Sequence, residues 1–350
     1  MDKPCGALII GGSGYGAGEL LRLLSMHPSI EVCGVVSRSH AGELVSEVHT
    51  HLSGLVSLTF DEAPDLCKLA RYKRHAVILA MPPGNAASTV DSLLSNEIGQ
   101  ETVVVDLSGD FRLRREDIHN RHYGDIPFRM ELRQRFTYGL PELGRDPIAT
   151  SHCISNPGCL ATAAVLALAP LAERIDSGCV VIDGKTGTSG AGREPQAAIH
   201  HPSRSCDFTA YKPLVHRHEP EIVQALGDRF ADNVEVLFVP HLLPVSRGIF
   251  VTAYIAQSKG LSPEHIKEVY FDFYRTAPFV RFRSAPPRLT DVVGTNFCDI
   301  FVTTRGSQIV VMATIDNLGK GMAGQAIQNV NLAFGLSEEA GLTAAALGPT

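Results

Sequence analysis

Short runs of apolar residues alternate with amphipathic segments through the first part of the chain. Four runs have the composition of buried parallel strands: residues 7–10, 31–36, 76–80 and 103–107. Segments with helical periodicity lie between them, for example residues 86–94. Strands that alternate with helices predict a doubly wound parallel sheet. We therefore expect residues 1–155 to form a Rossmann-type α/β domain.

Strand-like runs follow one another more closely in the second part of the chain. They cover residues 179–182, 234–239, 249–254, 299–302 and 308–312. This spacing predicts an α+β domain with a mixed or antiparallel sheet and helices on one face. A helical stripe over 263–277 follows Ser262, which is a plausible N-cap. We assign residues 156–318 to this second domain.

The last apolar periodicity, over residues 321–334, predicts a C-terminal helix. We expect the segment 319–350, which contains this helix, to pack with the first domain. A chain of 350 residues exceeds what one ordinary hydrophobic core holds, which agrees with two domains.

Composition and charge narrow the class of protein. The chain is 44% hydrophobic and 19% charged, as in soluble globular proteins. A formal net charge of -6 argues against a general nucleic-acid binder. No apolar run has the length of a membrane span, and the first residues show no signal-peptide pattern. We expect a cytoplasmic protein with neither a membrane nor a nucleic-acid partner.

A glycine-rich turn follows the first predicted strand and leads into a helical pattern. It reads Gly11-Gly12-Ser13-Gly14-Tyr15-Gly16-Ala17-Gly18. Glycines there let the backbone approach a pyrophosphate, which N–H groups at the helix start would hold. The spacing departs from the usual dinucleotide fingerprint. The alternative is a plain flexible turn.

The ends of the next predicted strands carry further candidate ligand-binding residues. Ser37 and Arg38 follow the second strand, where an NAD-binding fold has an acidic residue. A guanidinium suits a ribose phosphate, so we predict NADP rather than NAD, against a merely surface Arg38. Three residues that follow later strands are candidate lining residues, or otherwise structural turn residues: Pro82, Ser108 and Arg112.

Cys159 is the candidate nucleophile. It follows Asn156-Pro157-Gly158 and opens an Ala-rich run, residues 160–169, that favours a helix. The positive end of a helix stabilises a thiolate, and its unpaired N–H groups can hold an oxyanion. The alternative is a core cysteine at a capped helix. The eight cysteines contain no Cys-x-x-Cys pair, and we expect reduced thiols.

Two histidines, His216 and His218, are candidates for moving protons beside such a cysteine. Their spacing, repeated by His49 and His51, also permits a metal site, but no cysteine or carboxylate set completes a ligand pattern, so we predict no metal. Either histidine could also lie on the surface. A second glycine-rich loop, residues 187–193, could approach the nicotinamide or the substrate, or be simply a mobile loop.

Taken together, these motifs resemble the type 1 N-acetyl-gamma-glutamyl-phosphate reductases, a family of the aspartate-semialdehyde dehydrogenase superfamily. The motifs occur in the family's order from about Leu8 to Leu342: Gly14-Tyr15 with Glu19-Leu20, Ser37-Arg38, Asp110-Phe111-Arg112-Leu113, Tyr138-Gly139-Leu140-Pro141-Glu142, Asn156-Pro157-Gly158-Cys159, Ser189-Gly190-Ala191-Gly192-Arg193, His216-Arg217-His218, Arg247-Gly248-Ile249 and Asp316-Asn317-Leu318.

The resemblance implies an activity and a set of partners. The activity is NADPH-dependent reduction of N-acetyl-L-glutamyl 5-phosphate to N-acetyl-L-glutamate 5-semialdehyde, in arginine biosynthesis, through a cysteine thioester. The implied cofactor is NADP(H), the substrate a small acyl phosphate, and the assembly a homodimer or homotetramer. Residues 1–155 would then be the NADP-binding domain, and residues 156–318 the catalytic and dimerisation domain.

The resemblance also assigns residues to roles. Cys159 becomes the nucleophile, His218 the acid-base partner and His216 its support. The implied cofactor-binding residues are Ser13, Gly14, Tyr15, Gly16, Ala17, Ser37, Arg38, Ser189, Gly190 and Asn317. The glycine turn and the end of a predicted strand add Gly11 and Pro82 as cofactor-binding candidates. Arg112, Asn156 and Arg247 are candidates for the substrate.

The sequence departs from the family's motifs at two positions, and three other functions stay open. Ala17 stands where the family usually has a glycine, and Leu160 where many members have an aromatic residue. The pairs His200-His201 and Tyr211-Lys212 also resemble a lysine-biosynthesis reductase that acts on a carrier-linked aminoadipyl phosphate. A non-catalytic NADP-binding redox sensor and a cysteine hydrolase are the alternatives from other classes.

Overall fold

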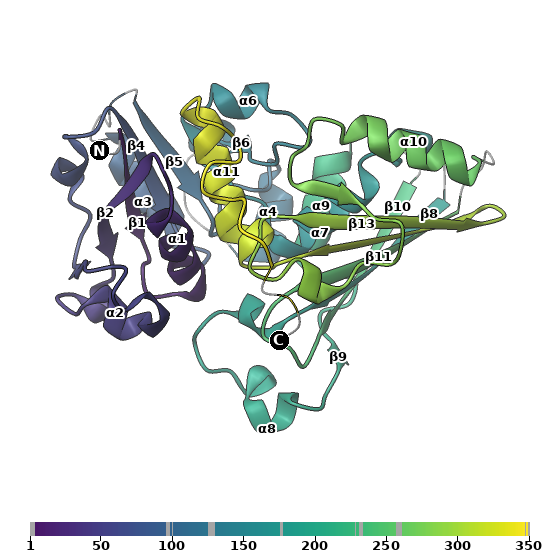
Figure 1. Ribbon diagram of the computed structural model, residues 1–350, viewed down its shortest axis with the longest axis horizontal. Coiled ribbons are helices and arrows are strands. Elements are labelled where there is room, and N and C mark those ends of the chain that lie inside the picture. The colour runs from purple at the N-terminus through teal and green to yellow at the C-terminus, as the bar shows by residue number, and fades with distance from the viewer. Residues whose placement is uncertain are drawn as a thin grey trace. The chain divides into compact units, whose positions relative to one another are not determined.

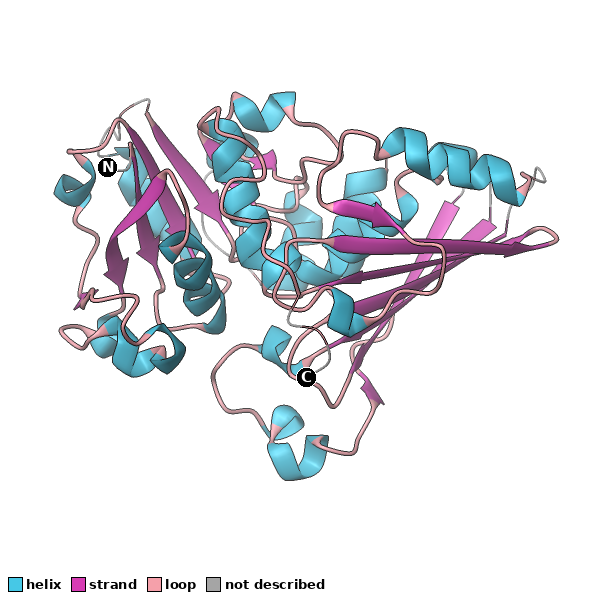
Figure 2. Ribbon diagram, viewed as in Figure 1, coloured by secondary structure: helices cyan, strands magenta, loops and turns pink. Residues whose placement is uncertain are grey.

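The computed structural model describes residues 4–95, 99, 101–124, 130–175, 178–227, 229–230, 234–256, 261–346 and 348 (Figures 1 and 2). The start of the chain, on which the signal-peptide expectation rests, lies outside these residues at 1–3. The chain divides into two compact units. Unit 1 comprises Met1–Pro157 and Met322–Thr343, and unit 2 comprises Gly158–Gly321 and Ala344–Thr350.

Unit 1 is built on a parallel sheet with the strand order β3-β2-β1-β4-β5-β7-β6. The strands are β1 (Cys5–Ile10), β2 (Ile30–Val36), β3 (Phe60–Asp61), β4 (Arg74–Leu79), β5 (Thr102–Asp106), β6 (Thr137–Tyr138) and β7 (Cys153–Ser155). The predicted Rossmann-type sheet is confirmed. The strands β3, β6 and β7 were not predicted, because segments this short carry no periodicity. The strand order reverses at β1 and β4, which is where such sheets bind ligands.

Helices flank this sheet, and two of them, α1 (Tyr15–Ser25) and α3 (Ala86–Ser95), bury several apolar residues. The flanking helices are α1 (Tyr15–Ser25), α2 (Val45–Val48), α3 (Ala86–Ser95), α4 (Glu116–Tyr123), α5 (Met130–Gln134), α6 (Asp146–Ala149) and α11 (Gly324–Ala333), with the 3-10 turns Arg38–His40, Thr50–Leu52 and Leu66–Leu69. Val90 and Leu93 of α3 pack with Leu8, Val77 and Val104 of three adjacent strands. These contacts form the core on one face of the sheet.

Helix α11 belongs to unit 1 although it comes from the end of the chain (Figure 1). It attaches through buried polar side chains. Asn329 Nδ2 donates to the Gly139 carbonyl at 2.9 Å, and Gln328 Nε2 to Glu142 at 3.1 Å. A π-helical turn, Gly319–Ala323, precedes it, so the single predicted helix over 321–334 is in fact two helical segments.

Unit 2 contains a mixed sheet with the strand order β12-β13-β14-β11-β8-β10-β9. The strands are β8 (Gly178–Thr186), β9 (Thr209–Ala210), β10 (Val234–Leu242), β11 (Ile249–Ala256), β12 (Val280–Phe282), β13 (Cys298–Arg305) and β14 (Gln308–Ile315). β8 pairs with β10, and β12 with β13, in parallel, and the other pairs are antiparallel. The predicted α+β architecture is confirmed.

The longer helices of unit 2 cover one face of its sheet (Figure 1). The helices are α7 (Cys159–Leu168), α8 (His201–Arg204), α9 (His218–Leu226) and α10 (Pro263–Phe273), with 3-10 turns at Ala172–Arg174, Thr188–Ala191, Ala197–Ile199 and Leu289–Asp291. Ser262 caps α10 as predicted, since its Oγ accepts the His265 N–H at 3.2 Å. Among the described residues no helix has the length and apolarity needed to cross a membrane.

Candidate active site

The glycine turn after β1 leaves open space before the first turn of α1. Gly11 has a φ of +87°, and a Cβ there would lie 2.6 Å from the Ala80 carbonyl oxygen. Gly14 immediately precedes α1, and a Cβ there would meet no atom within 4 Å. The predicted sequence of strand, turn and helix is confirmed, and the N–H groups at the start of α1 face this space.

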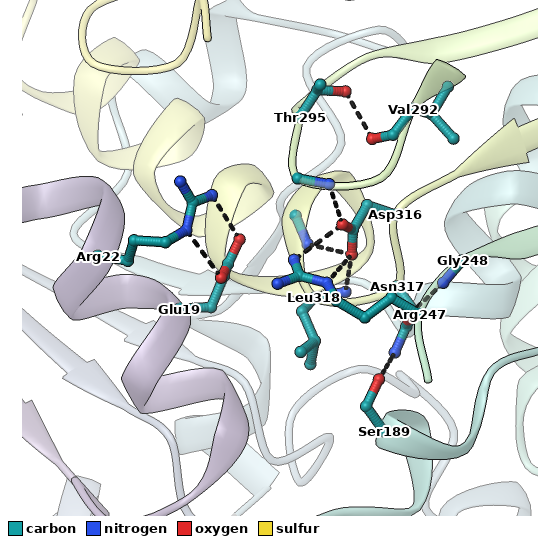
Figure 3. Close-up of polar contacts among 12 residues, drawn as sticks. Glu19, Arg22, Ser189, Arg247, Gly248, Val292, Thr295, Asp316, Asn317 and Leu318 are labelled. Atoms are coloured by element: carbon teal, nitrogen blue, oxygen red, sulfur yellow. Dashed lines mark hydrogen bonds and ion pairs between the residues drawn. The ribbon is translucent and has the colours of Figure 1, made fainter. Parts of the chain in front are cut away.

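Ala17 fits the helix without a glycine at its position. It is fully buried, while its neighbours make the close approaches that only glycine permits. A Cβ at Gly16 would lie 2.4 Å from Met322 Cε, and one at Gly18 would lie 2.7 Å from His49 Nδ1. The next residue of the motif, Glu19, is also buried and pairs with Arg22 at 2.7 Å (Figure 3).

His49 contacts the main chain of this turn. Its Nε2 lies 2.8 Å from the Gly12 carbonyl oxygen, and its ring meets that of His51 edge to face. Within the described part of the chain, no three His, Cys, Asp or Glu side chains form a group that could hold a metal ion.

Ser37 and Arg38 follow β2, and they differ in their exposure to solvent. Ser37 is buried, and its N–H donates to the Asp61 carbonyl at 3.0 Å. The Arg38 side chain is exposed and makes no hydrogen bond or ion pair with another described residue. Pro82, at the carboxyl end of β4, is exposed as well.

A buried carboxylate network fixes the loops after β4 and β5. Asp110 accepts three N–H groups at the start of α3, at 2.8 to 3.2 Å. Asp106 is fully buried and accepts the Ser108 hydroxyl at 2.6 Å. Burial raises the pKa of Asp106 to about 6, against the Ser108 hydrogen bonds, which lower it.

Arg112 and Asn156, both expected at the substrate, are buried inside unit 1. Arg112 Nε donates to the Asn156 carbonyl at 2.7 Å, and its Nη2 donates to the Leu107 carbonyl at 2.9 Å. The Asn156 side chain donates to the Met322 carbonyl at 3.1 Å and accepts from Asn329 at 3.2 Å. These contacts hold the chain just before Gly158-Cys159.

Cys159 is the first residue of α7, as predicted. It is partly exposed, whereas every later residue of α7 is buried. Gly158 before it adopts an extended conformation, and its N–H donates to Glu221 Oε1 at 2.7 Å. A Cβ at Gly158 would lie 2.3 Å from His218 Nε2. The imidazole of His218 is therefore packed against the residue next to the cysteine.

His216 and His218 form one buried unit at the start of α9. His216 Nδ1 accepts the His218 N–H at 3.1 Å, and the two ring centroids are 4.7 Å apart. Tyr211 meets the His216 ring edge to face. Burial raises the pKa of Tyr211, and the negative charge of a Cys159 thiolate adds to the rise. The structure thus places both predicted histidines in the interior and not on the surface.

Ser189 and Asn317 lie together, although they are far apart in the sequence (Figure 3). Asn317 Nδ2 donates to Ser189 Oγ at 2.8 Å, and its Oδ1 accepts the Gly248 N–H at 2.8 Å. A Cβ at Gly190 would lie 3.8 Å from Asn317 Nδ2. The second glycine-rich loop therefore packs against Asn317.

Arg247 is held by the fully buried carboxylate of Asp316 (Figure 3). Its Nε and Nη2 lie 3.2 and 2.8 Å from the two carboxylate oxygens. Asp316 also accepts the N–H groups of Leu318 and Gly319, at 2.8 and 3.1 Å. The carboxylate thus shapes the loop that follows β14.

The end of that loop reaches the cysteine. Gly321 donates its N–H to the Asp316 carbonyl at 2.8 Å, and a Cβ at Gly321 would lie 2.8 Å from Cys159 Cβ. The π-helical turn Gly319–Ala323 contains this glycine, and such turns are frequent at functional sites. The loop that contains Asn317 therefore also contacts Cys159.

Sequence reasoning did not select Glu221, Asp316 or Gly321. Glu221 follows His218 by three residues in a helical pattern, so the i,i+3 spacing was an available signal. Asp316 and Gly321 gave no such signal, because their partners Arg247 and Cys159 are distant in the chain.

Comparisons with known proteins identify the class first. Residues 7–151 match the family model described as "Semialdehyde dehydrogenase, NAD binding domain", and residues 159–317 match "Semialdehyde dehydrogenase, dimerisation domain". Aspartate semialdehyde dehydrogenase II from Vibrio cholerae has the same fold, with a TM-score of 0.68 at 15% identity over 95% of this chain and 99% of that one. The aspartate semialdehyde dehydrogenase with NADP from Candida albicans has a TM-score of 0.64 at 14% identity, over 93% and 97%. The chain is an oxidoreductase of the semialdehyde dehydrogenase fold.

The family follows from a closer relative. The chain is 43% identical over 341 residues to an N-acetyl-gamma-glutamyl-phosphate reductase from Methanothrix thermoacetophila, which covers 95% of this chain and 96% of the relative. This chain belongs to the N-acetyl-gamma-glutamyl-phosphate reductase family. The resemblance inferred from the motifs is confirmed.

Proposed function

We propose that this protein reduces N-acetyl-L-glutamyl 5-phosphate with NADPH. The acyl phosphate, NADPH and a proton give N-acetyl-L-glutamate 5-semialdehyde, NADP⁺ and phosphate. The observation that carries the proposal is the position of Cys159 at the start of α7, with the His218 imidazole packed against Gly158.

Cys159 acts as the nucleophile in this proposal. Its thiolate, stabilised at the helix N-terminus, attacks the acyl carbon, and the bond from that carbon to the phosphate oxygen breaks. Phosphate leaves and the acyl group stays on sulfur as a thioester. The N–H groups of the first turn of α7 stabilise the negative oxygen that develops at the acyl carbon.

His218 supplies the proton. NADPH, when bound, supplies the hydride that reduces the thioester carbon. The oxyanion of the tetrahedral species re-forms the carbonyl as the carbon–sulfur bond breaks, which releases the aldehyde, and the imidazolium of His218 gives its proton to the departing Cys159 sulfur. His216 holds the start of α9 through the His218 N–H, so it orients this imidazole.

The residues of unit 1 fit a dinucleotide phosphate. The open space before α1 suits a pyrophosphate at the helix N-terminus, and glycines at 11 and 14 keep that space clear. Arg38 is exposed and has no partner among the described residues, so its guanidinium is available to a ribose phosphate. In unit 2, Ser189, Gly190 and Asn317 are our candidates for nicotinamide neighbours.

The candidate substrate-binding residues differ in how exposed their side chains are. Arg247 has a quarter of its side chain exposed, so we propose it for the carboxylate or phosphate of the substrate. Arg112 and Asn156 remain candidates, but both are buried and bonded to main-chain groups of unit 1. Their contacts support a role in holding the turn before Cys159.

We also propose that the protein is a homo-oligomer, built through the open face of the unit 2 sheet. Leu237, Val181, Tyr254 and Val310 are register partners on four adjacent strands. The alternate residues of β8, Val180 and Ile182, are fully buried. This row therefore points away from the helices, and it is apolar enough to bind a second copy.

Phosphate dependence tests the reaction. The purified chain is given N-acetyl-L-glutamate 5-semialdehyde and NADP⁺, with and without phosphate, and NADPH formation is followed by absorbance. We expect NADPH only when phosphate is present, and none from Cys159→Ser, which should still bind NADPH. Binding without turnover would instead support a redox sensor. Preference for a carrier-linked aminoadipyl substrate, in parallel kinetics, would contradict the proposed substrate.

A further inference from the structure

A fully buried carboxylate, Asp316, follows directly after β14 and pairs with Arg247 (Figure 3). Its two oxygens lie 3.2 Å from Arg247 Nε and 2.8 Å from Nη2, so the carboxylate and the guanidinium meet along one edge. Asp316 also accepts the main-chain N–H groups of Gly294 and Leu318. A buried carboxylate is stable in its charged form only when it is paired and hydrogen-bonded, and Arg247 is the charged partner in these contacts.

The pairing decides which edge of the Arg247 guanidinium is available to a ligand. Asp316 takes the edge formed by Nε and Nη2, and the edge turned away from Asp316 carries Nη1. A quarter of the Arg247 side chain is exposed to solvent, whereas Asp316 is fully buried. The outer edge can therefore bind an anion while the inner edge stays on the carboxylate.

The residues that follow this carboxylate hold the same segment and reach the proposed nucleophile. Asn317 Oδ1 accepts the N–H of Gly248, the residue next to Arg247, at 2.8 Å. A Cβ at Gly321, in the π-helical turn that follows, would lie 2.8 Å from Cys159 Cβ. The arginine is therefore held by a loop that also packs on the cysteine.

We propose that Asp316 is a positioning residue that raises the affinity for the acyl phosphate by fixing the Arg247 guanidinium where an anionic group of the substrate binds. The proposal rests on the function proposed above. A guanidinium already held in one geometry loses less conformational freedom when it binds an anion. Without Asp316, the substrate itself would have to order the long Arg247 side chain, so binding would weaken.

Asp299 is the matched control, because it is another fully buried carboxylate of unit 2 that holds an arginine. Its Oδ1 accepts Arg281 Nε at 2.5 Å, and the Arg281 side chain is partly exposed, as that of Arg247 is. This pair lies on β12 and β13, whereas Asp316 lies in the loop that contains Gly321. Asp299→Asn therefore reports the general cost of neutralising such a carboxylate.

Steady-state kinetics with the acyl phosphate compares wild type, Asp316→Asn and Asp299→Asn. Asparagine keeps one oxygen for the N–H groups of Leu318 and Gly319 but loses the charge that holds the guanidinium, so we expect KM for the acyl phosphate to rise about tenfold in Asp316→Asn. We expect kcat and KM for NADPH to change by less than about threefold. An unchanged KM for the acyl phosphate, or an equal rise in Asp299→Asn, would overturn the proposal.

A double-mutant cycle tests whether Asp316 acts through Arg247. Arg247→Gln removes the anion contact and should raise KM for the acyl phosphate at least as much as Asp316→Asn does. In the double variant we expect KM to stay within about twofold of that of Arg247→Gln, because no guanidinium is left to position. Effects that multiply would contradict a role through Arg247.

Arg247→Lys keeps the proposal testable if Asp316→Asn does not fold. Lysine keeps the charge but lacks the planar fork that Asp316 orients, so KM for the acyl phosphate should again rise about tenfold. An unchanged KM in Arg247→Lys would mean that the fixed geometry of the guanidinium is not used, and the proposal would be wrong.

Chemical modification measures the state of Arg247 without the substrate. Phenylglyoxal reacts with guanidinium nitrogens, and its rate at Arg247 is followed by peptide mass spectrometry, with the exposed Arg288 as the reference. We expect a rate at least about fivefold higher in Asp316→Asn, because Nη2 loses a charge-assisted bond, and no change in Asp299→Asn. Inorganic phosphate, as the probe of the anion site, should slow the reaction more in wild type than in Asp316→Asn. An equal rate at Arg247 in wild type and Asp316→Asn would contradict the proposal.

The two readouts keep this proposal separate from the proposed function. If wild type does not turn over the acyl phosphate, but Arg247 reacts faster in Asp316→Asn and phosphate protects mainly the wild type, the proposed substrate is wrong and the role of Asp316 stands. If turnover is phosphate-dependent, but neither KM nor the reaction at Arg247 changes in Asp316→Asn, the function stands and the role of Asp316 is wrong.

Discussion

At the scale of single residues, the surroundings decide what a side chain does. Arg38 and Arg112 have the same chemistry, yet Arg38 is exposed and Arg112 is buried against the carbonyls of Leu107 and Asn156. Only the first is available to a ligand without breaking internal hydrogen bonds. The two arginines therefore support different proposals, a cofactor contact and a structural one.

Replacing Arg38 should weaken NADPH selectively. In Arg38→Ala we expect KM for NADPH to rise about tenfold or more, because a charge-assisted bond to the ribose phosphate is lost, while KM for NADH changes little. Steady-state kinetics with both cofactors measures this. Arg115→Ala is the control, since Arg115 is another exposed arginine of unit 1 that pairs with Asp117. Equal losses with both cofactors would contradict the assignment.

Asp106 should make stability depend on pH in an unusual direction. Its pKa is about 6 in the folded state against 3.8 ordinarily, so the folded state binds this proton more tightly. The contribution of Asp106 to stability is therefore fully favourable below about pH 4 and is lost as pH rises through 6. A shift of about two units in this pKa corresponds to about 3 kcal/mol in the free energy of unfolding.

Urea unfolding of wild type and Asp106→Asn at pH 4 and pH 7 tests this direction. Relative to wild type, we expect the variant to be more stable at pH 7 than at pH 4, by up to about 3 kcal/mol. Asp117→Asn should show a dependence of the opposite sign, because Arg115 lowers the pKa of Asp117. An equal effect of Asp106→Asn at both pH values would contradict the prediction.

At the scale of elements, α7 is the helix whose placement fixes Cys159. Its residues after Cys159 are all buried. Two carbonyls near its C-terminus accept hydrogen bonds from α10 and the residue that follows it, because the hydroxyls of Tyr270 and Tyr274 donate to Ala167 and Leu166 at 2.5 and 2.6 Å. These two bonds hold the end of α7 opposite the cysteine.

Removing one of these hydroxyls should destabilise the fold. Tyr270 is fully buried, so Tyr270→Phe leaves the Ala167 carbonyl without this donor, and we expect a loss of about 1 to 3 kcal/mol in the free energy of unfolding. Urea denaturation measures it. Tyr254→Phe, at an exposed tyrosine on β11, should change stability by less than about 0.5 kcal/mol. Similar values for the two variants would contradict the capping role.

At the scale of the whole molecule, each unit has its own sheet and core, and the proposed roles are divided between them. The glycine turn proposed for the dinucleotide lies in unit 1, and Cys159, the proposed nucleophile, lies in unit 2. Unit 2 also carries the open sheet face, on which Val181 and Tyr254 are 36% and 45% exposed. We propose this face for self-association, since the matching family model is described as a dimerisation domain.

A charge in the centre of this face should separate the subunits. In Tyr254→Lys we expect the mass from light scattering to fall to that of one chain, because the lysine would have to be buried without a partner. Phe271→Lys is the control, since Phe271 is 66% exposed on α10, outside the sheet face. A wild-type protein that is already a monomer, or an unchanged mass in Tyr254→Lys, would contradict the proposed interface.

The sequence by itself determined the fold class, most of the strands and the position of Cys159 at a helix start. These features depend on local properties: apolar runs, helical periodicity, and the glycines and prolines that interrupt them. Five short strands, β3, β6, β7, β9 and β12, were not predicted because two or three residues carry no periodic signal. The end of α10 at Phe273, short of residue 277, escaped for a similar reason, since helix ends are weakly encoded.

Tertiary structure alone decided which polar residues share a site. It brought Asn317 to Ser189, Asp316 to Arg247 and Glu221 to Gly158, and it turned Arg112 toward main-chain carbonyls. The physical reason is that a buried polar group must find a partner, and most of these partners are distant in the sequence. Residue type limits what a side chain can do, whereas the chain's path through the fold decides which group it meets.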